Sequence, residues 1–407
     1  MLRHVKLIGK NMIAQGLGTA GILGFTILAT RKLSIADYGE LRYVMTLLPL
    51  LAALTLPGYD SIILRQANLR RPIPMLPILG IRVAGGLLAS IFIFLTLLFL
   101  PQAITPSLRF FLISSAVLLP LHEVATGYRN YLIGRGLRNR SLDLVLLTRF
   151  LGLGFLGLGI GVISVLQLNW LFLYPIYLLG NILSNFFAFG RVTLKRLRVR
   201  VARSGPKEIR PALLVTLSGL VYTLGYSIDR LGMHQVLGSE ALAFYAVLTM
   251  IPLEVARLID TITPLYYRDL FYRGAHVGRS QIIFLLSVLI ALVIGYTLSF
   301  HFFSAAIFGQ AYKYQFHQLI LAGMLIATLS VEYFCAHRVF VLGGSVLMLT
   351  YSLSSLVAGV VAVAIGLYVG GVESLLIALL IKQLSLPLLF LELTKSLFEK
   401  YRKIDCS

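Results

Sequence analysis

The stretch RVTLKRLRVRVARSGPKEIRP, residues 191–211, divides the chain into two apolar halves. Of the 407 residues, 58% are hydrophobic and 13% are charged, whereas soluble domains contain about 45–50% and about 25%. On both sides of the basic stretch, apolar runs of about 20 residues recur, each long enough to cross a hydrocarbon core of roughly 30 Å. The sequence therefore predicts an all-α polytopic membrane protein.

About twelve transmembrane helices are expected from these apolar runs, six in each half. Their ranges are 11–30, 41–64, 75–100, 109–134, 141–166, 170–190, 211–231, 241–266, 281–303, 314–338, 345–369 and 374–394. The domains expected from them are an N-terminal six-helix bundle (1–190), a basic cytoplasmic linker (191–210), a C-terminal six-helix bundle (211–394) and a cytoplasmic tail (395–407).

The two halves begin their second spans alike, with ADYGELRYVMTLLPL at 36–50 and SEALAFYAVLTMIPL at 239–253. Both stretches contain Thr-x-x-Pro at the same position. An even number of spans per half gives the halves the same orientation, so the similarity indicates a parallel repeat about a pseudo-two-fold axis along the membrane normal. Chance similarity between apolar helices is the alternative.

Basic residues in the short loops predict the orientation of the chain. With the N-terminus inside, the inner segments contain 24 Lys and Arg and the outer segments contain 3. Because cytoplasmic loops are enriched in Lys and Arg, both termini are expected in the cytoplasm, with the protein in the inner (plasma) membrane. The net charge of +20 is spread over these loops, which favours contact with anionic lipids and not with nucleic acid.

Three stretches resemble the polysaccharide-biosynthesis exporters, the O-antigen repeat-unit flippases of the multidrug/oligosaccharidyl-lipid/polysaccharide exporter superfamily. They are LSIADYGELRYV (33–44), LPGYDSIILRQ (56–66) and YSIDRLGMHQVLGSEALAFYAV (226–247). Two departures are Tyr59, where the family has an aliphatic residue, and the polar Gly232-Met233-His234. Both leave the substrate open.

The resemblance implies two six-helix bundles around a central cavity. It also implies alternating access, by which an undecaprenyl-pyrophosphate-linked oligosaccharide repeat unit reaches the outer leaflet during surface-polysaccharide synthesis. Cavity arginines are the expected partners of the pyrophosphate. We expect a monomer driven by a gradient of H⁺ or Na⁺.

Charged residues inside the expected spans are the candidate site residues. A charge near the bilayer centre costs at least ~2.5–3.5 kcal/mol, so it normally faces a protein interior or a wet cavity. Arg82, Arg149 and Arg257 lie a few turns from the cytoplasmic ends of their spans. A pyrophosphate arriving from the inner leaflet would meet this depth, and a guanidinium suits phosphate geometry. We therefore expect these three arginines to bind the anionic headgroup.

Acidic residues are the candidates for ion coupling. Glu254, Arg257 and Asp260 recur at i, i+3 and i+6 on one face of the eighth span. One interpretation is a self-neutralising ladder of i,i+3 pairs. The other is that substrate binding to Arg257 releases Glu254 to take up an ion. Glu123 could serve the same purpose from the fourth span.

Asp229 and Arg230 are adjacent in the seventh span, in its outer half. Neighbouring residues on a helix point about 100° apart, so the two side chains cannot pair squarely with each other. Each therefore needs a partner on another helix or water. We expect an interhelical tie or a gate here.

Enzyme signatures are missing from the sequence. It contains no glycine-rich phosphate loop, no HExxH and no Cys/His cluster, so we expect neither an enzyme nor a cofactor or metal. The first alternative to the flippase is a drug/cation antiporter, which would favour an acid-dominated cavity. The second is a membrane-embedded glycosyl- or acyltransferase, which would need an Asp or His dyad in a sizeable surface loop.

Overall fold

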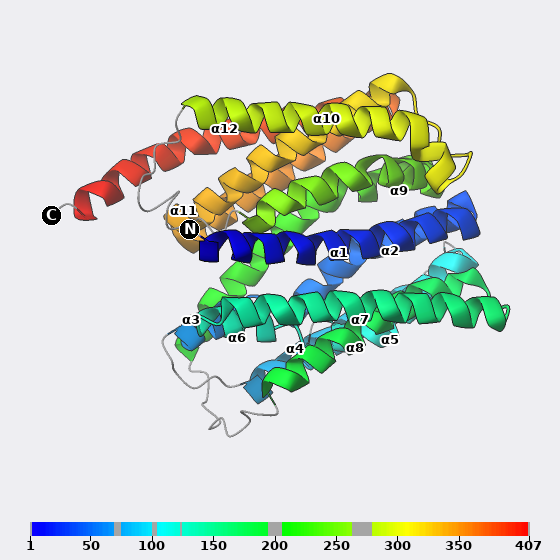
Figure 1. Cartoon of the computed structure of the whole chain (residues 1–407), viewed down its shortest axis with the longest axis horizontal. Coiled ribbons are helices and arrows are strands. Elements are labelled where there is room, and N and C mark those ends of the chain that lie inside the picture. Colours follow the sequence, from blue (N-terminus) through cyan, green and yellow to red (C-terminus); the bar gives the residue numbers. More distant parts are fainter. Residues whose placement is uncertain are drawn as a thin grey trace. The chain divides into compact units, whose positions relative to one another are not determined.

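The computed structural model describes residues 2–68, 75–99, 104–122, 124–193, 206–262 and 279–405, and all regular structure among them is helical (Figure 1). The elements are α1 (Leu2–Lys32), α2 (Ile35–Ala52), η1 (Ala53–Thr55), α3 (Tyr59–Asn68), α4 (Met75–Phe99), α5 (Pro106–His122), α6 (Tyr128–Gly134), α7 (Arg138–Val165), η3 (Trp170–Phe172), α8 (Leu173–Thr193), α9 (Pro206–Ile262), α10 (Arg279–Phe308), α11 (Phe316–Gly370) and α12 (Val372–Asp405).

Most of the helices can cross a membrane. Within the described ranges, 9 helical segments are long and apolar enough to do so. One of them, Leu213–Arg257, has 45 residues, which is about twice the ~20 residues that one crossing requires. The predicted all-α polytopic fold is confirmed.

Helices α9 and α11 each contain two of the expected spans, because each folds back on itself. In α9 the backbone leaves helical geometry at Gly238, where φ is 86°. Tyr245 and Asp229 are hydrogen-bonded, although sixteen residues of straight helix would separate them by about 24 Å. In α11, Ser355 donates to Glu332 over 3.3 Å, where a straight helix would separate the two residues by about 35 Å.

Two other expected spans are broken. The range 41–64 was expected to be one continuous helix, but the structure ends α2 and η1 before Leu56 and starts α3 at Tyr59. Pro57 lacks a backbone N–H and disfavours helical geometry in the residue before it, and Leu56 is left-handed with φ 54°. The range 109–134 is likewise split into α5 and α6 around residues 124–127.

The chain divides into two compact units, Met1–Leu220 and Val221–Ser407. In the first unit, α7 packs on α8 and α1, while α4 and α2 pack on α5. In the second unit, α11 packs on α12 and α10. The division lies within the expected seventh span. Most of the expected linker, residues 194–205, is outside the described part of the chain.

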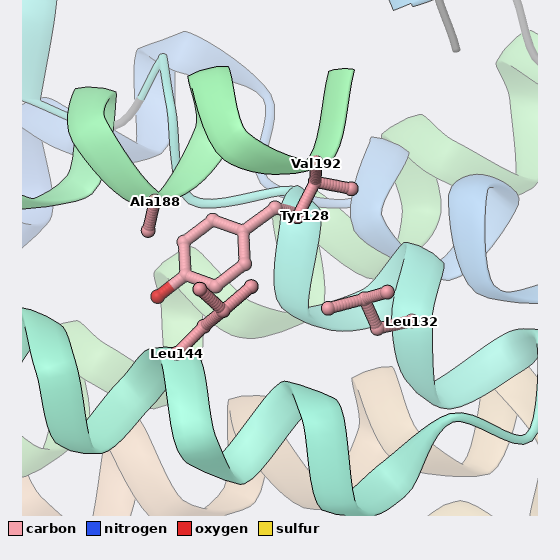
Figure 2. Packing of buried hydrophobic residues seen from close by; sticks show 5 residues of the cluster. All are labelled: Tyr128, Leu132, Leu144, Ala188 and Val192. Atoms are coloured by element: carbon pink, nitrogen blue, oxygen red, sulfur yellow. The ribbon is translucent and has the colours of Figure 1, made fainter. Parts of the chain in front are cut away.

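The core of the first unit shows why its helices approach so closely. Figure 2 shows Tyr128 of α6 between Leu144 of α7 and Ala188 of α8, and all three are buried. On α4, a Cβ added at Gly85 would lie 2.1 Å from the carbonyl oxygen of Leu54. Only glycine allows α4 this close to the broken segment after α2, so the break and the helix packing depend on each other.

Candidate functional site

A small polar cavity lies inside the second unit, between the two arms of α9 and helices α11 and α12. The volume open to the centre of a water molecule is about 20 Å³, which is roughly room for one water. Its polar lining residues are Tyr226, Asp229, Arg230, Tyr245, Thr249, Lys382 and Gln383. Charges from two helical segments, the first arm of α9 and α12, therefore meet in an otherwise apolar bundle.

Asp229 ties the two arms of α9 together. Its Oδ2 accepts a hydrogen bond from the hydroxyl of Tyr245, which lies on the other arm. Its Oδ1 is buried and has no hydrogen-bond partner among the described residues. One carboxylate oxygen is thus held by the protein, and the other remains able to bind a water, a proton or a cation.

Arg230 is buried beside this carboxylate. Its side chain is 8% exposed, and its guanidinium carbon lies 5.6 Å from the centre of the Tyr226 ring. The Nε of Arg230 has no hydrogen-bond partner within the described chain. Buried polar atoms normally find a partner in protein or ordered water, so this N–H group and Oδ1 of Asp229 are suited to share a water in the cavity.

Lys382 reaches the cavity from α12 and forms a buried ion pair behind it. Its Nζ lies 2.9 Å from Oε1 of Glu332 on α11, and the two side chains are 5% and 1% exposed. Next to it, Thr328 donates to Gln383 over 2.5 Å. The cavity therefore contains Asp229, Arg230 and Lys382, with Glu332 adjacent. The formal charges cancel, and adding a proton or a cation would unbalance them.

Glu254, predicted for ion coupling, and Arg257, predicted to bind the headgroup, are not among the residues that line this cavity. Arg257 and Glu254 form an ion pair, and their side chains are 46% and 12% exposed. The i,i+3 contact expected from the sequence is thus present between these two. The side chain of Asp260, the third member of the ladder, lies outside the described residues, and so does Glu123.

The predicted headgroup arginines of the first unit have different surroundings. Arg82 on α4 is 1% exposed and donates to Asp60 over 2.5 Å and to Thr126 over 3.1 Å. Thr126 lies in the break between α5 and α6, and Asp60 lies in the first turn of α3, directly after the break at residues 56–58. Arg149 on α7 is exposed, and its Nε lies 3.1 Å from where a Cβ on Gly18 would be. Arg82 is thus enclosed by its partners, whereas Arg149 is accessible.

Sequence reasoning missed Tyr245 and the pairing of Lys382 with Glu332. Tyr245 reaches Asp229 only because the chain reverses at Gly238. The sequence did contain a signal that could have predicted the partner of Lys382. A lysine deep in an apolar span needs an acidic partner, and Glu332 is an acid within another expected span.

Solved structures share this arrangement of helices along almost the whole chain. An outward-facing multidrug resistance MATE family transporter of the MOP superfamily matches with a TM-score of 0.65 and 17% identity, over 98% of this chain and 96% of that one. The chain has the MATE fold. A MOP superfamily transporter from Pyrococcus furiosus matches with a TM-score of 0.62 and 16% identity, over 97% and 95%. A MATE structure in the straight conformation gives 0.62 and 17%, over 98% and 96%.

The superfamily named for these solved structures is the one that the sequence motifs resemble. The structures that match are described as MATE or MOP transporters, not as O-antigen flippases. No protein-family model and no curated protein matches the sequence. The similarity thus defines the fold, and the polar cavity lies in the C-terminal unit of that fold.

Proposed function

We propose that the chain is an ion-coupled membrane transporter that works by alternating access. The observation that carries this proposal is the buried charged cavity of the second unit, where Asp229 has an unpartnered oxygen. Ionisable residues inside a membrane are costly and typically line ion or substrate pathways. The MATE fold, shared over 98% of the chain with a multidrug transporter, supports the same function.

The coupling step follows from the contacts of Asp229. A proton or Na⁺ bound at its Oδ1 neutralises the carboxylate and weakens its attraction to the adjacent Arg230. The hydrogen bond from Tyr245 joins the two arms of α9, so the charge of Asp229 also affects how firmly these arms are held together. Ion binding and helix arrangement are then linked, and each must influence the other.

For the substrate class, the solved structures favour a drug or cation antiporter, the alternative to the flippase. The first of them is described as a multidrug resistance transporter. A transferase gains no support, because these structures are transporters. A flippase for an undecaprenyl-pyrophosphate-linked oligosaccharide is the second candidate. It is favoured by the exposed arginines Arg149 and Arg257, which suit an anion better than a cation.

Purified protein in liposomes with an acidic lumen tests the proposal. One arm follows uptake of ethidium, and the other follows the movement of a fluorescent polyprenyl-pyrophosphate oligosaccharide between leaflets. Gradient-driven ethidium uptake would support the antiporter, and movement of only the lipid would support the flippase. Asp229→Asn should abolish coupling to the gradient. Glu240→Gln, which removes an exposed carboxylate of α9, is the matched control and should transport normally.

Two results would overturn the proposal. The first is that neither probe moves faster than in empty liposomes under a H⁺ or a Na⁺ gradient. The second is that Asp229→Asn retains the full response to the gradient, which would place the coupling ion elsewhere.

A further inference from the structure

A groove on the first unit is separate from the polar cavity and from the candidate arginines described above. It lies between α7 and α8, which Figure 1 shows side by side, and has a volume of about 700 Å³. Pockets for small ligands typically measure about 300–1,000 Å³. Leu144, Leu147, Phe186 and Phe187 form the apolar part of the groove. The far side of Leu144 packs on Tyr128 in the core of this unit (Figure 2).

The charged residues of the groove gather at one end. Helix α7 begins at Arg138 and α8 ends at Thr193, so Arg140 and Arg191 lie at neighbouring helix ends and both are exposed. Phe186 and Leu147 lie one to two turns further in, which is about 7–10 Å along the helices. The groove therefore changes from cationic to apolar along its length.

The acid in this groove is already neutralised. Asp143 lies between the two ends of the lining, and a free carboxylate there would repel an anion. Its Oδ1 accepts a hydrogen bond from Lys10 Nζ at 2.6 Å. The guanidinium of Arg191 lies 5.2 Å from the centre of the Phe187 ring, which orients it over the apolar part. The net charge left to a ligand is positive.

We propose that this groove binds one anionic phospholipid. Its phosphate lies between Arg140 and Arg191, and an acyl chain follows Leu147, Phe186 and Phe187 toward the bilayer centre. Guanidinium groups bind phosphate oxygens in a bidentate manner, and the N–H groups of the first turn of α7 favour an anion at the same end. Lysine and arginine at helix ends are typical of the cytoplasmic side, where anionic lipids are abundant.

The chain itself does not supply a suitable occupant from the adjoining sequence. The segment 194–205 that follows α8 contains Lys195, Arg196, Arg198, Arg200 and Arg203 and no acidic residue. Its charge has the same sign as that of the groove. A lipid with a negative headgroup and an apolar tail complements both parts. The site goes beyond the proposed transport function, because it requires no particular substrate.

Fluorescence quenching by brominated lipids tests the site. The chain has 1 tryptophan, so Trp170→Phe combined with Phe187→Trp places the only indole in the groove. The protein is reconstituted into phosphatidylcholine liposomes that contain either dibrominated phosphatidylglycerol or dibrominated phosphatidylcholine. Phosphatidylglycerol should bind preferentially, by roughly fivefold for each arginine and up to about thirtyfold for the pair.

Arginine variants distinguish a specific site from general attraction to the surface. Arg140→Gln with Arg191→Gln should reduce the preference to about one. Arg138→Gln removes an exposed arginine from the same turn of α7 that does not line the groove, and should leave the preference unchanged. Equal quenching by both lipids would overturn the proposal, as would a preference that survives the double substitution. An indole that no brominated lipid quenches would also overturn it, since another protein surface would then cover the groove.

Discussion

Lys382→Met removes one partner of the buried ion pair in the second unit. The side chains of Lys382 and Glu332 are 5% and 1% exposed, and their charged atoms lie 2.9 Å apart. In the variant, Glu332 loses this cation and keeps the neutral hydroxyl of Ser355, which lies 3.3 Å from its Oε1. Leaving one charge of a buried pair uncompensated costs about 3–5 kcal/mol. We therefore expect a large loss of stability from this one substitution.

The size of this loss can be measured by heating. A destabilisation of that magnitude corresponds to a Tm lower by roughly 6–20 °C for a domain of a few hundred residues. The assay heats detergent-solubilised protein and measures by size-exclusion chromatography the fraction that stays monodisperse. Lys313→Met is the matched control, because Lys313 is exposed. Its effect should stay within about 0.5 kcal/mol.

The double variant Lys382→Met/Glu332→Gln separates a buried charge from a general packing defect. Replacing both members of a buried pair with neutral residues of similar volume is often close to neutral in stability. The double variant should therefore recover most of the Tm that the single variant loses. The reasoning is refuted if Lys382→Met melts like the parent chain, or if the double variant is no more stable than the single one.

Three further substitutions test the packing of α4 and the partly exposed pair of α9. Gly85→Ala should destabilise the first unit by about 1–3 kcal/mol, because its Cβ would meet the Leu54 carbonyl. Gly80→Ala has open space and should be up to about 1 kcal/mol more stable; equal Tm values would contradict this. Arg257→Ala should change stability by less than about 1 kcal/mol, since its pair with Glu254 is half-exposed. A loss of transport would then reflect function, and normal transport would exclude Arg257 from the site.

The sequence was sufficient to predict the class of fold, because hydrophobic runs of membrane-spanning length are a local property. The positions of the breaks were harder to predict. Pro57 is a local signal for the break beside the left-handed Leu56, but the close approach of Gly85 on α4 to Leu54 joins residues about thirty positions apart and could not be read from the sequence. Apolar content alone predicted one continuous span over residues 41–64.

The candidate site was predicted in part. The cost of burying a charge singled out Asp229, Arg230 and Arg82 from the sequence. Their partners depend on the tertiary fold, since Tyr245 reaches Asp229 only after the reversal at Gly238. Glu332 and Lys382 are brought together from different helices in the same way. Single-sequence patterns identify which residues need a partner, and the packing of the helices decides which partner each receives.

The central claim is that ion binding at Asp229 shifts the chain between two arrangements. Leu166→Cys and Gln235→Cys, combined with Cys406→Ser, provide one spin-label position in each unit. Pulsed electron–electron double resonance then measures the distance between the two labels in lipid nanodiscs. Cys335 is 1% exposed and should not be labelled. The account predicts two distance populations whose ratio changes between pH 8 and pH 4.5, or on addition of Na⁺, and a single unchanging population in Asp229→Asn. A distribution in the parent chain that responds to neither ion would contradict it.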